Sequence, residues 1–149
     1  MIVIDANDDL SRHTGAEAVS AWQPLSQQRV TDFADASDDR NPLHVDPGFA
    51  RTTPYGSTIA HGYYFMATAP SLLETLWRLT GFSFAVAYGV DRIRFPSALP
   101  TGTRFRLRLK IIAIEQIPDG IQVRTDLTFE GEELERPVCV AESLYRAYR

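Results

Sequence analysis

The sequence of 149 residues contains a single cysteine, Cys139, and no block of like charges. One cysteine cannot form an internal disulfide, and its place in an alternating segment indicates a small buried hydrophobic residue. No apolar run approaches the about 20 residues that a membrane-spanning helix requires. Met1–Asp5 is too short for a signal-peptide core and lacks preceding basic residues. We therefore expect a soluble, cytoplasmic protein.

The composition restricts the kind of partner. The formal net charge is −4, and the 15 lysines and arginines are scattered along the chain, which argues against nucleic acid as a partner. The proportions of 44% hydrophobic and 23% charged residues are ordinary for a soluble globular protein. A chain of this length buries roughly two thirds of its unfolded surface in one domain.

Turn-forming residues divide the chain into two regions. Residues 1–17 are predicted to form an N-terminal extension with one short helix, and residues 18–149 to form the main domain. Within that domain Ser26 is a predicted N-cap for a helix through Ala36. A second, longer helix is predicted at 59–80, with its first half buried.

Four strands are predicted after the long helix, at residues 82–95, 103–117, 120–129 and 137–148. Apolar residues alternate with basic ones at Phe105, Leu107 and Leu109. One face of such a sheet is solvated and the other packs on another element. The long helix is the available element, so we expect an α+β architecture in which an antiparallel sheet wraps around a central helix.

The stretch Ser37–His44 carries the most specific chemical signal. It places the carboxylate of Asp39 and the imidazole of His44 on either side of a turn with Pro42. Because Pro42 biases Asn41 away from helical dihedral angles, the chain is expected to bend there, and both side chains then reach one water molecule. A carboxylate and an imidazole at one water are typical of acid–base catalysis.

The same residues also have structural interpretations. Asp39 can end a helix, His44 can be a buried structural histidine, and Asn41 can brace the turn through its side chain. His61 together with Asp39 and His44 suggests a metal site, but no two of them have the local spacing of zinc ligands. We expect no metal.

Several motifs in order along the chain carry a resemblance to a known family. They are Phe33–Pro47 (FADASDDRNPLHVDP), Ile59–Gly62 (IAHG), Tyr88–Gly89, Arg94–Pro96 (RFP) and Pro100–Gly102 (PTG). Over roughly residues 18–149 the sequence resembles the MaoC-like dehydratases, which include the (R)-specific enoyl-CoA hydratases. One departure is Asp38, which stands where many members of that family carry glycine.

The resemblance implies a hot-dog fold, a homodimer whose sheets join edge to edge, and a tunnel for an acyl-CoA thioester. It implies that Asp39 and His44 are the catalytic pair and that the backbone N–H of Gly62 donates to the thioester oxygen. Asn41, Tyr63 and Tyr64 are candidate substrate contacts, although the two tyrosines can equally be core residues. No cofactor is implied, because the coenzyme A thioester is the substrate.

The activity implied is the reversible syn addition of water to a trans-2-enoyl-CoA, giving an (R)-3-hydroxyacyl-CoA. Two alternatives remain open. In a hot-dog acyl-CoA thioesterase the same water attacks the carbonyl carbon, and a non-catalytic relative only binds the acyl thioester. The Asp-x-Asn-Pro-x-His arrangement favours hydration, whereas a fold shared by several activities does not separate them.

Overall fold

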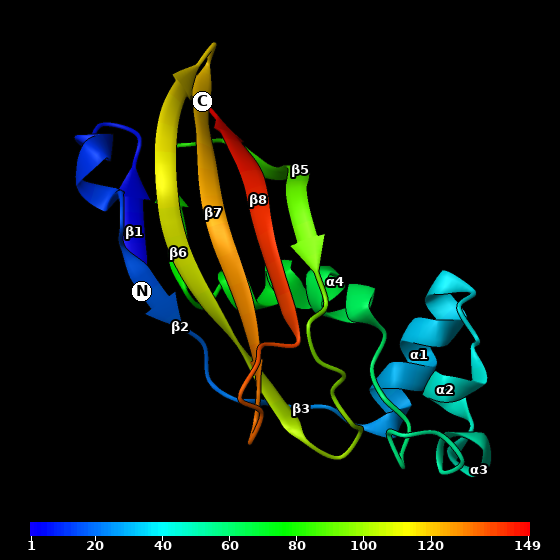
Figure 1. Cartoon of the computed structure of the whole chain (residues 1–149). Helices are drawn as coiled ribbons and strands as arrows, with labels where there is room; N and C mark the ends of the chain where they lie inside the picture. Colours follow the sequence, from blue (N-terminus) through cyan, green and yellow to red (C-terminus); the bar gives the residue numbers. More distant parts are fainter.

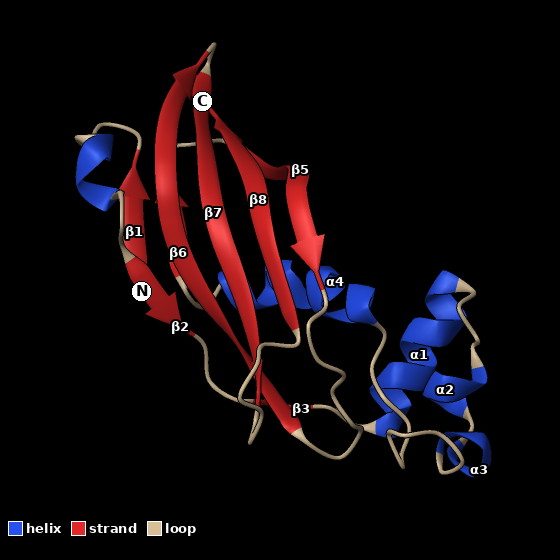
Figure 2. Cartoon of the chain, in the orientation of Figure 1, coloured by secondary structure: helices blue, strands red, loops and turns tan.

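The computed structural model describes residues 1–149 and is built around one curved antiparallel sheet. Its strand order is β2 (Glu17–Val19), β6 (Arg104–Ile117), β7 (Gly120–Gly131), β8 (Cys139–Tyr148) and β5 (Phe84–Arg94), and the short β3 (Gln23–Pro24) also pairs with β6. The long strands curve in front of α4 (Gly62–Leu73), as Figures 1 and 2 show. The predicted α+β hot-dog fold is confirmed.

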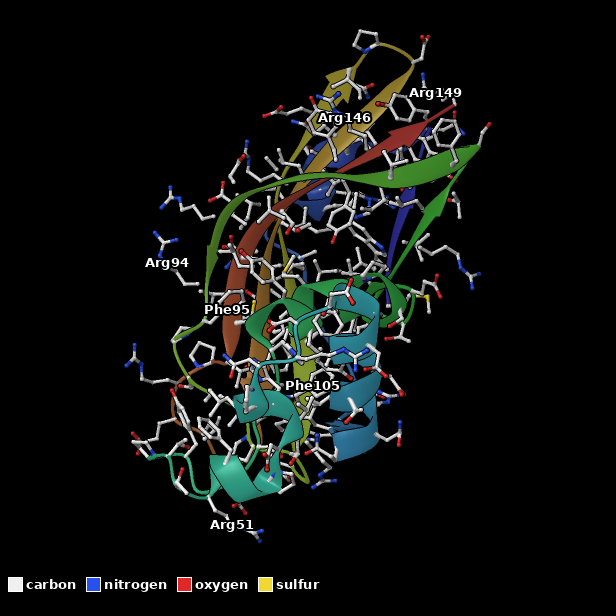
Figure 3. The ribbon with its side chains drawn as sticks, turned by 90° about the vertical axis from the view of Figure 1, so that its right-hand side faces the viewer. Arg51, Arg94, Phe95, Phe105, Arg146 and Arg149 are labelled. Atoms are coloured by element: carbon white, nitrogen blue, oxygen red, sulfur yellow. The ribbon has the colours of Figure 1, made fainter.

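Alternation of side chains explains why one sheet face packs on α4. On β6, Phe105, Leu107 and Leu109 are at most 1% exposed, while the intervening Arg106 and Arg108 both bind the carboxylate of Glu130. Phe105 points from the sheet toward the helices (Figure 3) and meets the ring of Phe65 on α4 edge-on, at 5.3 Å between centroids. Cys139 is fully buried, as predicted.

The predicted helix at 59–80 is wrong at both ends. Residues 59–61 are extended, because Ile59 forms a bridge with Pro100 and the Ala60 amide donates to the Leu99 carbonyl. The helix ends at Leu73, and Trp77–Thr80 becomes strand β4, paired in parallel with β1 (Ile2–Asp5). The helix is also buried on one face only, since Tyr63 is 65% exposed.

The N-terminal residues lie along the main sheet. After β1, the segment Leu10–His13 forms a 3-10 helix, and β2 follows at Glu17. Buried Ile4 and Leu10 pack with Ile111 and Ile121 of the sheet. None of the helices combines the length and the apolar character that a membrane span requires.

Three helices stand beside one end of the sheet, and the Ser37–His44 stretch runs from the end of the first into the second. They are α1 (Gln27–Ser37), α2 (Pro42–Val45) and α3 (Pro47–Ala50), seen in blue and cyan at the lower right of Figure 1. The chain returns from them through residues 58–61 into α4. This return brings the end of α1, helix α2 and the start of α4 together.

Candidate active site

The end of α1 sets the position of Asp39. Ser26 caps the start of the helix by accepting the Arg29 amide at 3.2 Å, as predicted. The helix ends at Ser37, and Asp38 follows in the left-handed region with φ of 58°. Glycine is the residue best suited to that conformation, and aspartate tolerates it better than most others. The chain reverses there, and Asp39 follows with its side chain exposed.

Asn41 starts the second short helix. Its side-chain oxygen accepts the Leu43 amide at 3.0 Å, and Pro42 occupies the first helical position. This is the usual role of an N-cap residue, and proline suits the position because its missing N–H would have no partner there. The side chain of Asn41 therefore braces the turn, and a substrate contact from its amide group remains a prediction.

The tautomer of His44 follows from one hydrogen bond. Its Nδ1 lies 2.8 Å from the carbonyl oxygen of Ile59, which can only accept. In the neutral ring Nδ1 therefore carries the proton, and Nε2 keeps a free lone pair. An imidazole fixed in this way presents Nε2 as a base.

The predicted convergence of Asp39 and His44 is present, and it includes a third residue. One potential ligand atom from each of Asp39, His44 and His61 lies within 4.8 Å of the other two. The two imidazole rings are stacked, with centroids 3.7 Å apart and planes at 28°. The bend at Pro42 thus brings a carboxylate and an imidazole to within the span of one bridging water.

The stacking bears on whether this cluster suits a metal ion. A histidine binds a metal through a lone pair in the plane of its ring, about 2.0–2.1 Å from the metal for zinc. The rings of His44 and His61 lie in nearly parallel planes with their centroids 3.7 Å apart, so an ion in the plane of one ring would lie outside the plane of the other. The arrangement suits a shared water molecule better than a shared metal ion.

Gly62 opens helix α4 with amides that no side chain caps. His61 is the N-cap residue and forms no capping hydrogen bond, and the first amides of a helix have no acceptor within the helix. A Cβ at position 62 would lie 2.7 Å from the ring of Phe95, so glycine is required here by a close approach. Figure 3 marks Phe95 just past the end of β5.

A cavity of about 210 Å³ joins His44 to the start of α4. Its walls are mostly apolar and come from His44, Tyr55, Ile59, Ala60, Gly62, Phe65, Phe95, Ser97, Ala98 and Val138. Neither predicted tyrosine lines it. Tyr64 is 4% exposed and packs in the core, and Tyr63 is exposed with its ring edge-on to Phe95 at 5.3 Å. Their roles as substrate contacts stay predictions.

Two residues that support the site were not predicted from the sequence. Gln27 on α1 donates to the carbonyl of His44 at 2.8 Å, and its side-chain oxygen accepts the hydroxyl of Thr58 at 2.5 Å. Thr58 also shares a hydrogen bond with Thr101. The only sequence signal was that Thr58 directly precedes the Ile59–Gly62 motif, while Gln27 lies in no motif.

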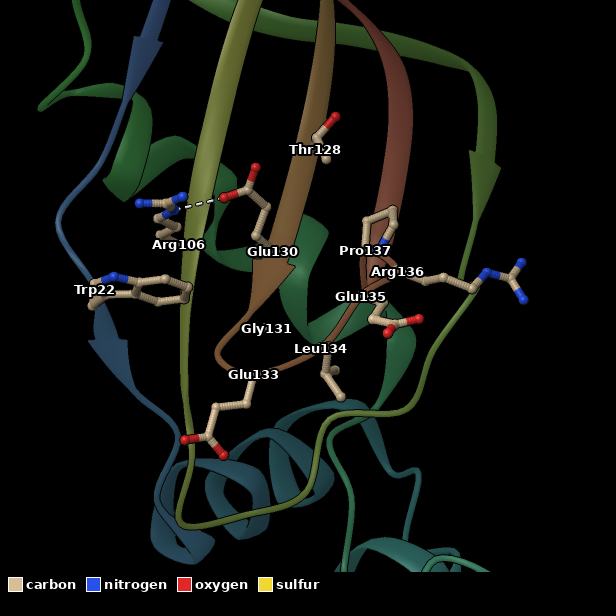
Figure 4. Close-up of a pocket in the computed structure, with 10 residues that line it drawn as sticks. All are labelled: Trp22, Arg106, Thr128, Glu130, Gly131, Glu133, Leu134, Glu135, Arg136 and Pro137. Atoms are coloured by element: carbon tan, nitrogen blue, oxygen red, sulfur yellow. Dashed lines mark hydrogen bonds and ion pairs between the residues drawn. The ribbon is translucent and has the colours of Figure 1, made fainter.

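Other hollows of the surface lack these features. The one in Figure 4, of about 360 Å³, lies on the sheet face opposite α4. Its Arg106 donates to Glu130 at 2.6 Å and its guanidinium lies 4.6 Å from the centroid of the Trp22 ring. This paired charge stabilises the sheet surface, and no histidine or helix start faces the hollow.

Comparisons with known proteins agree with one another. The profile described as MaoC like domain matches residues 10–132. The chain is 38% identical over 128 residues, 85% of either protein, to 3-hydroxyacyl-thioester dehydratase Z of Mycobacterium tuberculosis. It is 42% identical over 111 residues, 74% of this chain and 67% of the relative, to 3-hydroxybutyryl-CoA dehydratase of Methylorubrum extorquens. The unliganded R-hydratase PhaJ1 of Pseudomonas aeruginosa superposes with a TM-score of 0.74 at 25% identity, covering 91% of this chain and 82% of that one.

Proposed function

The chain belongs to the MaoC-like dehydratase family, and on this basis we propose that it is a hydro-lyase acting on acyl thioesters. The specific reaction proposed is the reversible syn addition of water to a trans-2-enoyl-CoA, which gives an (R)-3-hydroxyacyl-CoA. Its relatives include proteins named for 3-hydroxyacyl-thioester and 3-hydroxybutyryl-CoA dehydration. The (R) configuration draws support from the superposition on an R-hydratase.

One observation carries the proposal, namely the meeting of Asp39 and His44 within 4.8 Å beside the uncapped start of α4. A water molecule between the two side chains gives up a proton to Nε2 of His44 while its oxygen bonds to C3. The pair returns a proton to C2 from the same face, so that one water adds across the double bond. Positioned acid–base groups of this kind contribute about 10²–10⁴ in rate.

The thioester oxygen needs a hydrogen-bond donor while negative charge develops on it. The backbone N–H of Gly62 is the proposed donor, because it opens α4 and has no acceptor within the helix. The positive end of the helix dipole adds to the effect. A donor of this type is worth about 3 kcal/mol of transition-state stabilisation.

The acyl chain requires an apolar space near α4. A cavity of about 300 Å³ lies between α4 and β5, with Met66 and Pro70 on the helix side and Ala87, Val90 and Tyr145 on the sheet side. Phe65 lines the His44 cavity and Met66 lines this one. Adjacent residues of α4 thus line the two cavities. We place the acyl chain in the cavity between α4 and β5.

The experiment is a chain-length series of 2-enoyl-CoA thioesters incubated with the purified protein. We expect loss of the conjugated chromophore, formation of the (R)-3-hydroxy product and no release of free thiol. Asp39→Asn is the matched control and should slow the loss of chromophore by about two to four decades. Thiol release in place of hydration would identify a thioesterase. Binding without turnover, equal in the wild type and in Asp39→Asn, would identify an acyl-thioester-binding protein.

A further inference from the structure

His61 is a histidine that the proposed reaction does not use, although it is only 3% exposed and lies within the catalytic cluster. Two other aromatic rings contact its ring. The ring of His44 is stacked on it with centroids 3.7 Å apart, and Phe33 of α1 meets it edge-on at 5.0 Å. A buried imidazole must satisfy its polar nitrogens or lose stability.

The hydrogen bonds of His61 define its protonation. Its Nε2 lies 2.9 Å from the backbone carbonyl of Asp39, so Nε2 must carry the proton. Its Nδ1 is buried and has no hydrogen-bond partner. A second proton would place an N–H at Nδ1 without an acceptor, and a positive charge against His44. Burial is the main cause that lowers the pKa of His61, and the nearby His44 lowers it further, although Asp39 acts in the opposite direction.

These contacts connect every part of the proposed site. The Nε2–H of His61 holds the backbone of Asp39, the residue that leaves α1 after the reversal at Asp38. The ring face limits the position of His44. The residue is also the N-cap of α4 and directly precedes Gly62, so its position affects where the Gly62 amide lies.

We infer that His61 is a positioning residue. As a neutral imidazole with its proton on Nε2, it holds Asp39 and His44 in place relative to the Gly62 amide. This inference rests on the proposed hydration of acyl thioesters. His61 takes no proton from the water, since its free nitrogen, Nδ1, is buried. A displacement of about 1 Å in a catalytic group can cost about 10²-fold in rate.

Two substitutions separate positioning from simple packing. His61→Phe keeps an aromatic ring against His44 but removes the donor to Asp39, and His61→Gln restores an N–H near the place of Nε2. With crotonyl-CoA we expect kcat to fall about 10- to 100-fold in His61→Phe with KM changed less than about threefold. His61→Gln should recover at least about a third of this loss, measured as log kcat. His13→Phe replaces another buried histidine, outside the site, and should keep the wild-type kcat.

The inference is overturned if His61→Phe keeps a kcat within about twofold of the wild type, or if His61→Gln is as impaired as His61→Phe. A second measurement needs neither a variant nor a substrate. The protein has three histidines, so nitrogen NMR can assign each tautomer in the wild type. At pH 6, where an ordinary histidine of pKa about 6.5 is mostly protonated, His61 should be neutral with its proton on Nε2.

A protonated His61 at pH 6, or a proton on Nδ1, would contradict the inference even if His61→Phe does not fold. The two proposals also fail in different ways. Absence of hydration by the wild type removes the proposed reaction while leaving the tautomer result intact. If the wild type and His61→Phe hydrate crotonyl-CoA equally well, only the proposed role of His61 is removed.

Discussion

At the scale of single residues, Asp39 and His44 are proposed to act on one water, so their contributions to the rate should not be independent. We expect Asp39→Asn and His44→Ala each to lower kcat by about two to four decades. The double variant should lose little more than the worse single variant, because parts of one unit are not additive. Steady-state kinetics on crotonyl-CoA measure this. A double variant whose loss of kcat is the product of the two single losses would show that the two side chains do not share a water.

Asp38 gives a prediction about stability that is separate from catalysis. Its φ of 58° lies where glycine is unstrained and a β-branched residue is strongly disfavoured. Asp38→Val should lower the free energy of unfolding by about 1–2 kcal/mol, and Asp38→Gly should change it by less than about 1 kcal/mol. Urea unfolding provides the values. Equal stability of the valine and glycine variants would show that the left-handed turn is not kept in solution.

The sequence predicted the chemical residues of the site better than the residues that support them. Asp39, His44 and Gly62 lie in motifs, so their types and spacing were readable. The left-handed turn at Asp38 is a conformation in which glycine is unstrained. The contacts of Gln27 and His61 cross 17 and 22 residues of sequence. No local pattern encodes such pairs, and only the folded chain reveals them.

At the scale of secondary-structure elements, the strands after residue 82 could be predicted because alternation and turn residues are local signals. The end of the long helix could not. Trp77–Thr80 is apolar enough to continue the helix, but its partner is Ile2–Asp5, at the other end of the chain. Tertiary pairing overrides local preference in such a segment, and a single sequence does not show which distant strand is available.

The link between α1 and α2 depends on one glutamine. Gln27 donates to the His44 carbonyl and accepts from Thr58, whereas the adjacent Gln28 bonds only within α1, to Asp32. Gln27→Ala should lower the free energy of unfolding by about 1–3 kcal/mol, because it leaves the partners of two part-buried hydrogen bonds unsatisfied. It should also lower kcat through the position of His44.

Gln28→Ala is the matched control for that change, since it has the same chemistry on an exposed part of the same helix. It should stay within about 0.5 kcal/mol of the wild type, with an unchanged kcat. Thermal unfolding measures the stability of the two variants, and steady-state kinetics measure their kcat. Equal effects of the two substitutions would mean that the contacts of Gln27 do not hold helix α2.

The cavity between α4 and β5 gives a prediction about acyl chain length. Met66 lines it from the helix, and its flexible side chain can adapt to different chains. Met66→Trp should fill much of the space, so kcat/KM should fall at least tenfold for long enoyl chains while the crotonyl value changes about threefold or less. The chain-length series on both proteins measures this. A uniform loss at every length would place the acyl chain elsewhere.

At the scale of the whole molecule, β5 is an open edge of the sheet. It pairs only with β8, and Phe84, Val86, Tyr88 and Val90 are between 41% and 57% exposed. A long apolar edge strand presents unpaired backbone groups that favour pairing with another chain. Two copies related by a two-fold axis can join antiparallel through the same strand. We therefore expect a homodimer in which two β5 strands form one continuous sheet.

Charge on this edge should separate the copies without unfolding them. Val86→Asp together with Val90→Asp changes side chains that are already exposed in the single chain, so the monomer should remain folded, while like charges across the two-fold axis repel. Val19→Asp is the control, because Val19 is 38% exposed on β2 at the opposite edge of the sheet. Analytical ultracentrifugation should give about twice 16.7 kDa for the wild type and the control, and 16.7 kDa for the double variant. A monomeric wild type, or a double variant that stays dimeric, would exclude pairing through β5.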